Sequence, residues 1–246
     1  MKILLIAGHG NGDPGATAKF GGTTYREADE TRRMVSLLAP RLQVMGASVT
    51  IYNQAYNAYE DWKNGCLTSR AKFENFDYVF EVHLNALALS GQDGKTKGVE
   101  IYVTTTEKST GVEDAICRNI AAIGFTNRGV KRKNFSVIST AKKQGTSSAL
   151  VELCFIDDYD DMTLYVKCRE KVADAIVAGI AEGFGLAKST AAASPVNTVT
   201  SAETPAAWAK TAWDAATAKG VTDGTRPTDP VTRQEVVTMM HRLGLF

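Results

Sequence analysis

The sequence has no run of apolar residues long enough to cross a membrane. The apolar segment near the N-terminus, residues 3–7, is far shorter than the roughly 20 residues that a bilayer requires. It is also shorter than the apolar part of a secretory signal peptide, about 7–15 residues, and it leads directly into Gly8, His9 and Gly10. We therefore predict no membrane insertion, and synthesis in the cytoplasm without an N-terminal signal peptide.

An excess of charge of one sign is also lacking. The 28 lysines and arginines nearly balance the 27 aspartates and glutamates, which leaves a formal net charge of +1. Affinity for nucleic acid depends on basic side chains that neutralise phosphates, so this balance argues against a nucleic-acid partner. Hydrophobic residues make up 44% of the chain, which is typical of a globular protein with a substantial core.

Cysteine and histidine are both scarce. The four cysteines show neither CxxC nor zinc-finger spacing, and we predict that all four are free thiols. Of the three histidines, His9 and His83 stand at the ends of predicted strands, whereas His241 lies in a predicted helix near the C-terminus. Because His9 and His83 occupy equivalent positions at the ends of two strands, they are the first indication of a functional site.

Strand-like and helix-like segments alternate over residues 1–186. The predicted strands are residues 2–7, 48–52, 78–83, 99–103, 136–139 and 149–155. Helical spacing of apolar residues predicts helices at residues 25–45 and 112–123 and a last helix around residues 172–184. This alternation predicts an α/β fold with a twisted, mostly parallel sheet flanked by helices.

The composition changes after residue 186. Residues 187–205 are mostly Ala, Ser, Thr, Pro and Val, which cannot bury enough apolar surface to fold, and we predict a linker there. Residues 206–246 contain two segments with helical spacing, 206–219 and 232–243. They predict a small helical C-terminal module.

The two histidines indicate a metal site at one edge of the sheet. His9 lies in the glycine-rich segment GHGNGDPGA after the first strand, and His83 closes the third. The carboxyl ends of parallel strands gather at one edge, so the two imidazoles should lie close together. The alternative, a phosphate-binding loop, lacks the Gly-Lys-Ser/Thr ending and the dinucleotide fingerprint. A catalytic zinc commonly has a carboxylate as third ligand, and Glu27, Asp29 and Glu30 are the candidates.

Glu152 stands out because it lies in the middle of the apolar segment 149–155. A buried carboxylate is costly unless it is paired or functional. Beside an activated water it would act as a general base. The alternative is a structural glutamate held in an ion pair.

These segments together resemble the zinc-dependent N-acetylmuramoyl-L-alanine amidases of bacterial autolysins and phage endolysins. The resemblance covers about residues 1–186 and is carried, in order, by GHGNGDPGA, GGTTYREAD, Arg70, EVHLNA, GVEIYV and ALVELCFIDD. It implies Zn²⁺ bound by His9, Glu27 and His83, with Glu27 favoured over the two neighbouring acids, and Glu152 as the catalytic carboxylate. We also predict that Asn85, in the His83 motif, contacts the substrate.

The resemblance implies hydrolysis of the amide bond between N-acetylmuramic acid and L-alanine in peptidoglycan. Together with the missing signal peptide, it favours a phage endolysin that is made in the host cytoplasm and acts on a Gram-positive wall after release. Two alternatives stay open: a zinc peptidase that cuts another amide in the wall, and a wall-binding protein without catalytic activity.

The chain departs from the family pattern at two places. The strand before His83 reads Phe80-Glu81-Val82, where relatives usually carry a serine, and Cys154 stands where they usually have glycine. Strand alternation places Cys154 on the same side as Glu152, near the metal. We expect a small buried thiol there rather than a fourth ligand.

The C-terminal module resembles an S-layer homology motif. The resemblance is carried by residues 218–235 and 241–244, with Trp208 as the aromatic residue that opens the unit. It implies attachment to an anionic secondary cell-wall polysaccharide, for which Arg226 and Arg233 are the candidate contacts. Such motifs commonly occur in threes and this chain has one, so the alternative is a module that forms a homodimer.

Overall fold

The computed structural model describes residues 1–87, 94–187, 210–221, 236 and 239–241. The chain divides into two units, residues 1–190 and residues 191–246, which are taken separately below. Among the described residues, no helix has both the length and the hydropathy needed to cross a bilayer.

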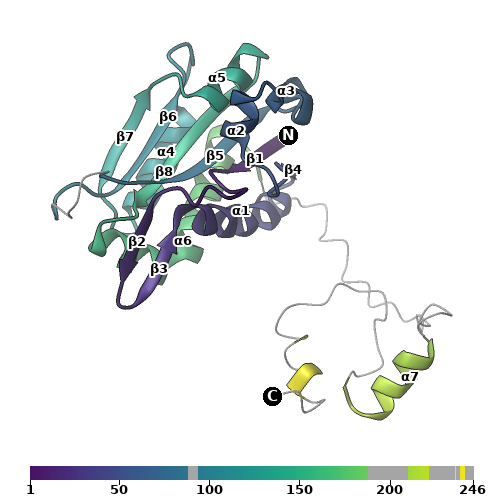
Figure 1. Ribbon diagram of the computed structural model, residues 1–246. Helices are drawn as coiled ribbons and strands as arrows, with labels where there is room; N and C mark the ends of the chain where they lie inside the picture. Colours follow the sequence, from purple (N-terminus) through teal and green to yellow (C-terminus); the bar gives the residue numbers. More distant parts are fainter. Residues whose placement is uncertain (88–93, 188–209, 222–235, 237–238, 242–246) are drawn as a thin grey trace. The chain divides into compact units, whose positions relative to one another are not determined.

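The first unit is built on a six-stranded sheet with the strand order β4-β1-β5-β8-β6-β7 (Figure 1). The strands are β1 (Lys2–Ala7), β4 (Ser48–Ile51), β5 (Tyr78–Asn85), β6 (Val99–Val103), β7 (Asn127–Arg132) and β8 (Ser147–Phe155). Neighbouring strands run parallel except for β6 and β8, which are antiparallel. The predicted α/β fold with a mostly parallel sheet is therefore confirmed.

Helices cover both faces of this sheet. The helices α1 (Glu27–Val44), α4 (Gly111–Ala121) and α6 (Tyr159–Phe184) pack around the larger core cluster on one face. The other face carries α2 (Ala58–Lys63), α3 (Leu67–Arg70), the 3₁₀ helix η1 (Phe73–Asn75) and α5 (Ser136–Lys143) over a smaller cluster. Side chains alternate between the two, with Leu5 and Val82 in the larger cluster and Leu4 and Val79 in the smaller one.

The helix predicted at residues 25–45 begins two residues later than expected. Tyr25 and Arg26 belong to a separate two-stranded hairpin of β2 (Thr17–Phe20) and β3 (Thr23–Arg26), which the sequence analysis did not anticipate (Figure 1). Arg26 still pairs with Thr17 in this hairpin, so the helix cannot start before Glu27. Glu27 is thereby the first residue of α1, at the point where the hairpin turns into the helix.

The predicted strand at residues 136–139 is wrong, because this segment begins helix α5. A short apolar run fits a strand or a buried helical turn equally well. The deciding pattern lies further along the chain: Val137 and Ala141, four residues apart, are both buried in the smaller core cluster. Strand β7 was also missed, since its residues are mostly polar and only partly buried.

Strand β8 contains an irregularity that overturns the predicted orientation of Cys154. Its pairing with β5 shifts between His83–Glu152 and Asn85–Phe155, so β8 has one more residue than β5 over this stretch. The extra residue breaks the alternation. Cys154 is fully buried in the larger core cluster, whereas Glu152 lines a cavity. The expected small buried thiol is confirmed, and all four cysteines are free.

The second unit is described only in part. Helix α7 (Lys210–Ala218) lies within the predicted helix 206–219, and residues 236 and 239–241 are helical within the predicted helix 232–243. Trp208, Arg226, Arg233 and residues 188–205 of the predicted linker lie outside the described residues. The boundaries at 187–205 and 206–246 therefore stay predictions.

Candidate active site

The loop after β1 brings His9 against His83. The two ring centroids are 5.0 Å apart, with the rings nearly perpendicular. His9 has a left-handed backbone, with φ of 62°, which is uncommon outside glycine and occurs at functional sites. At Gly8, a Cβ atom would lie 2.3 Å from the His83 ring. The close approach of the two imidazoles therefore depends on a glycine at position 8.

Glu27 lies between the two imidazoles. Its Oε2 is 3.1 Å from Nε2 of His9, and its Oε1 is 2.9 Å from Nδ1 of His83. One potential ligand atom from each of the three residues lies within 4.8 Å of the other two. Two imidazole nitrogens and a carboxylate are a typical protein ligand set of a catalytic zinc. The three ligands predicted from the sequence thus come together and fit this metal.

The other two acidic candidates on α1 are used elsewhere. Glu30 is buried and pairs with Arg33 at 3.2 Å and with Arg169 at 2.9 Å. Asp29 is exposed and lies 3.7 Å from Arg26. Of the three acidic residues, only Glu27 has its carboxylate against both histidines.

Backbone amides hold the Glu27 carboxylate in place. The Ala16 amide donates to Oε2 and the Leu84 amide donates to Oε1, each at 3.0 Å. Burial would raise the pKa of Glu27, but hydrogen bonds from His83 and His9 and the charges of both rings outweigh it and hold the pKa well below its usual range. Glu27 is therefore a fixed anion, as a metal ligand should be.

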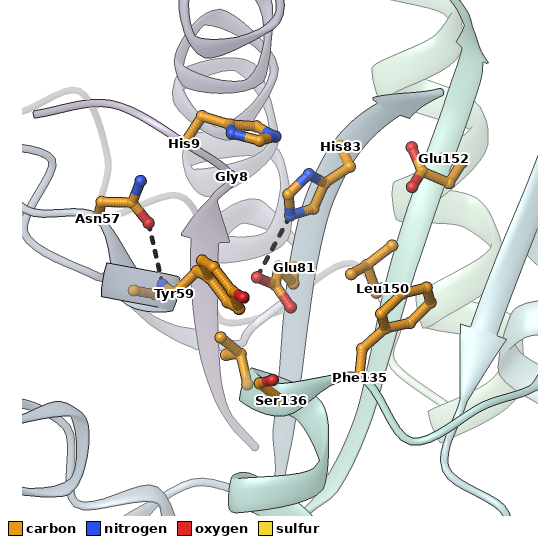
Figure 2. Close-up of a pocket in the computed structure, with 12 residues that line it drawn as sticks. Gly8, His9, Asn57, Tyr59, Glu81, His83, Phe135, Ser136, Leu150 and Glu152 are labelled. Atoms are coloured by element: carbon orange, nitrogen blue, oxygen red, sulfur yellow. Dashed lines mark hydrogen bonds and ion pairs between the residues drawn. The ribbon is translucent and has the colours of Figure 1, made fainter. Parts of the chain in front are cut away.

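A second carboxylate lies behind each histidine. Oδ2 of Asp13 is 2.8 Å from Nδ1 of His9. Figure 2 shows the equivalent contact of His83, whose Nε2 is 3.3 Å from Oε1 of Glu81. Such partners fix the ring orientation and the proton position, which leaves the opposite nitrogen of each ring for the metal. Neither role was predicted from the sequence. Strand alternation puts Glu81 on the same face as His83, and Asp13 is the acidic residue of the glycine-rich motif.

Glu152 lies beside this cluster. It pairs with His83 across β5 and β8, and both side chains line a cavity of about 240 Å³ together with His9, Glu81 and Tyr59 (Figure 2). Burial raises the pKa of Glu152 to about 7; a charged His83 opposes the rise and the nearby carboxylates reinforce it. Its Oε2 is buried and has no hydrogen-bond partner among the described residues. A carboxyl group of this kind is suited to accept and then return a proton near neutral pH.

Asn85 belongs to a polar network next to Glu152. Its Nδ2 donates to Oε1 of Glu100 at 2.8 Å, and its Oδ1 accepts the Ala86 amide at 2.9 Å. Glu100 pairs with Glu152 across β6 and β8 and forms ion pairs with Arg128, at 2.6 Å, and with Lys131. The predicted contact of Asn85 with the substrate is not tested by these bonds and stays a prediction.

The profile of the N-acetylmuramoyl-L-alanine amidase family matches residues 3–182. This range is most of the chain, and it contains the His9, Glu27 and His83 group that fits the zinc site of the family. The chain belongs to the N-acetylmuramoyl-L-alanine amidase family, whose enzymes are cell-wall hydrolases.

Individual relatives agree with this assignment. The chain is 28% identical over 196 residues to the "Probable autolysin PH" of Staphylococcus aureus, a match that covers 74% of the chain and 38% of the autolysin. It is 26% identical over 211 residues to the N-acetylmuramoyl-L-alanine amidase CwlM of Bacillus licheniformis, covering 78% of the chain and 72% of CwlM. The chain thus spans well under half the length of the staphylococcal autolysin.

The fold is that of solved amidase structures. The catalytic domain of the CD27L endolysin, which targets Clostridia difficile, superposes with a TM-score of 0.59 at 23% identity. The match covers 74% of the chain and 97% of that domain. At this identity the likeness supports the fold alone.

Replacing Asp13 tests whether the outer carboxylate orients His9. We expect Asp13→Ala to weaken zinc binding by about 10–100-fold, because His9 would lose its partner. Asp13→Asn should lose less, since its amide oxygen still accepts from the ring. Affinity is measured by competition with a chromophoric chelator.

The matched control is Asp29→Ala, which removes an exposed carboxylate from the same region and should leave the zinc affinity unchanged. Wild-type affinity in a folded Asp13→Ala protein would show that His9 is oriented without Asp13.

Proposed function

We propose that this chain hydrolyses the amide bond between the lactyl group of N-acetylmuramic acid and L-alanine of the peptidoglycan stem peptide. The observation that carries the proposal is the partly buried Glu152 carboxyl beside the cluster of His9, Glu27 and His83. The family match over residues 3–182 supplies the substrate class.

The zinc would be held by Nε2 of His9, Nδ1 of His83 and the Glu27 carboxylate. When bound, it supplies Lewis acidity toward the amide carbonyl and a water that loses its proton near neutral pH. Asp13 and Glu81 keep the two rings in the orientation that this coordination needs.

Glu152 moves the proton in this mechanism. As an anion it accepts the proton of the attacking water, and as an acid it returns that proton to the leaving nitrogen of L-alanine. Its pKa of about 7 places both forms within reach at neutral pH. Leu150 and Val137 line the same cavity and give it apolar walls, which lower the local polarity around the transfer.

Two alternatives from the sequence analysis are less well supported. A zinc peptidase acting on another wall amide would use the same cluster, but the family match favours the muramoyl amide. A wall-binding protein without catalytic activity gives no reason for a Glu152 whose buried Oε2 has no hydrogen-bond partner among the described residues. The endolysin origin and the route to the wall stay predictions, because an autolysin and an endolysin both occur among the similar proteins.

Digestion of purified Gram-positive peptidoglycan tests the proposed bond. We expect mass spectrometry to find new L-alanine amino termini and muramic acid with a free lactyl carboxyl group. A chelator should abolish these products and added zinc should restore them, because the ligand cluster requires the metal. New ends at a different amide would establish the peptidase alternative. If no new ends are found, the alternative of a wall-binding protein without catalytic activity is supported.

Glu152→Gln separates the base from the metal ligands. The variant keeps the shape of the side chain but cannot accept the proton, so kcat should fall by about 10²–10⁴-fold with the zinc still bound. His83→Ala, by contrast, should lose both zinc and activity. A zinc-loaded Glu152→Gln enzyme that turns over at the wild-type rate would assign the base to another residue.

We further propose that residues 206–246 attach the enzyme to the wall. The support is the S-layer homology resemblance, with Trp208, Arg226 and Arg233 as contacts to an anionic secondary cell-wall polysaccharide. The competing role is a homodimer formed through this module.

Truncation after residue 190 tests the attachment. The first unit contains the sheet, the ligand cluster and Glu152, so residues 1–190 should fold, bind zinc and cleave soluble muropeptides at close to the full-length rate. On intact cells the truncated enzyme should be slower, because attachment raises the local enzyme concentration at the wall. If the truncation instead converts a dimer into a monomer in size-exclusion chromatography, and residues 191–246 fused to a reporter do not label walls, the module serves dimerisation.

A further inference from the structure

Two large aromatic side chains lie together on the surface next to the cavity that His9, His83 and Glu152 line, which is called the zinc cavity below. Tyr59 and Trp62, on adjacent turns of α2, have ring centroids 5.7 Å apart and planes inclined by 21°. They are 50% and 43% exposed, although burial of rings of this size would stabilise the fold. Such an exposed aromatic pair, called the aromatic pair below, is typical of a binding surface.

The aromatic pair is tied to the metal loop through Asn57. The side-chain oxygen of this buried residue accepts the Tyr59 amide at 3.0 Å and so begins helix α2 (Figure 2). Its side-chain nitrogen donates to Oδ2 of Asp13 at 3.1 Å, the same oxygen that orients His9. Helix α2 is therefore connected through Asn57 to the residue that orients a zinc ligand.

A second cavity, of about 410 Å³, shares a lining residue with the cavity of His9, His83 and Glu152. Tyr59 lines the first cavity, Trp62 lines the second, and Ser136 lines both. Uncharged polar side chains provide most of the rest of the second lining, namely Thr104, Thr106, Asn134, Ser139 and Thr140. The hydroxyl oxygen of Ser139 is buried and has no hydrogen-bond partner among the described residues.

This lining matches the chemistry of a sugar. A pyranose ring presents C–H groups on its face, which pack on an aromatic ring, and hydroxyl and acetamido groups around its rim, which pair with hydroxyls and amides. We propose that the aromatic pair and the second cavity bind the glycan strand of peptidoglycan through the N-acetylhexosamine rings that flank the cleaved muramic acid. This inference rests on the proposed function and adds to it a binding site for the glycan strand.

The stem peptide fits this surface less well. Its ionised groups would need charged partners, but of the nine residues that line the second cavity only Lys142 and Lys143 are charged, and Lys142 is already paired with Glu107 at 2.9 Å. On the other side of Glu152, Arg128 and Lys131 bring positive charge to Glu100 in strand β6, which pairs directly with β8. A neutral polymer therefore suits the aromatic side of the cavity better than a charged peptide does.

The experiment compares two substrates in Trp62→Ala. One is uncrosslinked glycan chains that carry stem peptides, and the other is N-acetylmuramoyl-pentapeptide, which has a single sugar. We expect the KM for chains to rise by about 10-fold relative to the KM for the monomer, with kcat for chains unchanged. Trp62→Phe, which keeps a ring, should restore most of the difference. Tyr159→Ala, which removes a 55% exposed ring outside both cavities, is the matched control and should behave as wild type.

Direct binding gives a second measurement that does not depend on catalysis. Wild-type protein should bind a hexamer of β-1,4-linked N-acetylglucosamine saturably in calorimetry, and Trp62→Ala with wild-type zinc content should bind it about 10-fold more weakly. No saturable binding by the wild type, or an equal rise of KM for both substrates, overturns the glycan site even where hydrolysis is normal. If the wild type hydrolyses neither substrate but still binds the hexamer, the proposed function is refuted and the glycan site is supported.

Discussion

The structure of the site depends on one buried anion, the Glu27 carboxylate between His9 and His83. Removing a carboxylate from water is costly, and here two backbone amides and two imidazoles compensate for it. Glycines at positions 8 and 15 leave the room that this crowding needs, since a Cβ at Gly15 would lie 2.7 Å from Oε2 of Glu27. A zinc ion fits where three ligand atoms already face one another.

The same site shifts the pKa values of two carboxyl groups in opposite directions. The imidazoles hold the pKa of Glu27 well below its usual range, whereas burial raises the pKa of Glu152 to about 7. Glu152 pairs with His83 across adjacent strands but has no hydrogen bond to its Oε2 among the described residues, so burial dominates there. One group is thereby suited to bind a cation permanently and the other to exchange a proton.

Much of the site could be predicted because its main parts lie at the carboxyl ends of parallel strands. His9 comes two residues after the apolar strand β1, and His83 lies near the end of the apolar strand β5, so both could be recognised in the sequence. The family resemblance selected Glu27 where helical spacing left Asp29 and Glu30 open. The residues behind the ligands were harder to find. Asp13 and Glu81 act through contacts of 2.8 and 3.3 Å with the far side of each ring, which no spacing rule reports.

The sequence by itself predicted the α/β class, most of the strands and the longer helices, because these follow from hydrophobic periodicity. The order of its motifs predicted the metal ligands and Glu152 as the base through the family resemblance. The tertiary structure decided what depends on contacts between distant segments. Packing on the sheet made residues 136–143 a helix, and the extra residue in β8 turned Cys154 into the core. Contacts with distant segments placed the aromatic pair beside the cavity, because the short helix α2 is held by the bond from Asn57 to Asp13, the bond from Tyr52 to Asp61 and the packing of Ala58 in the core.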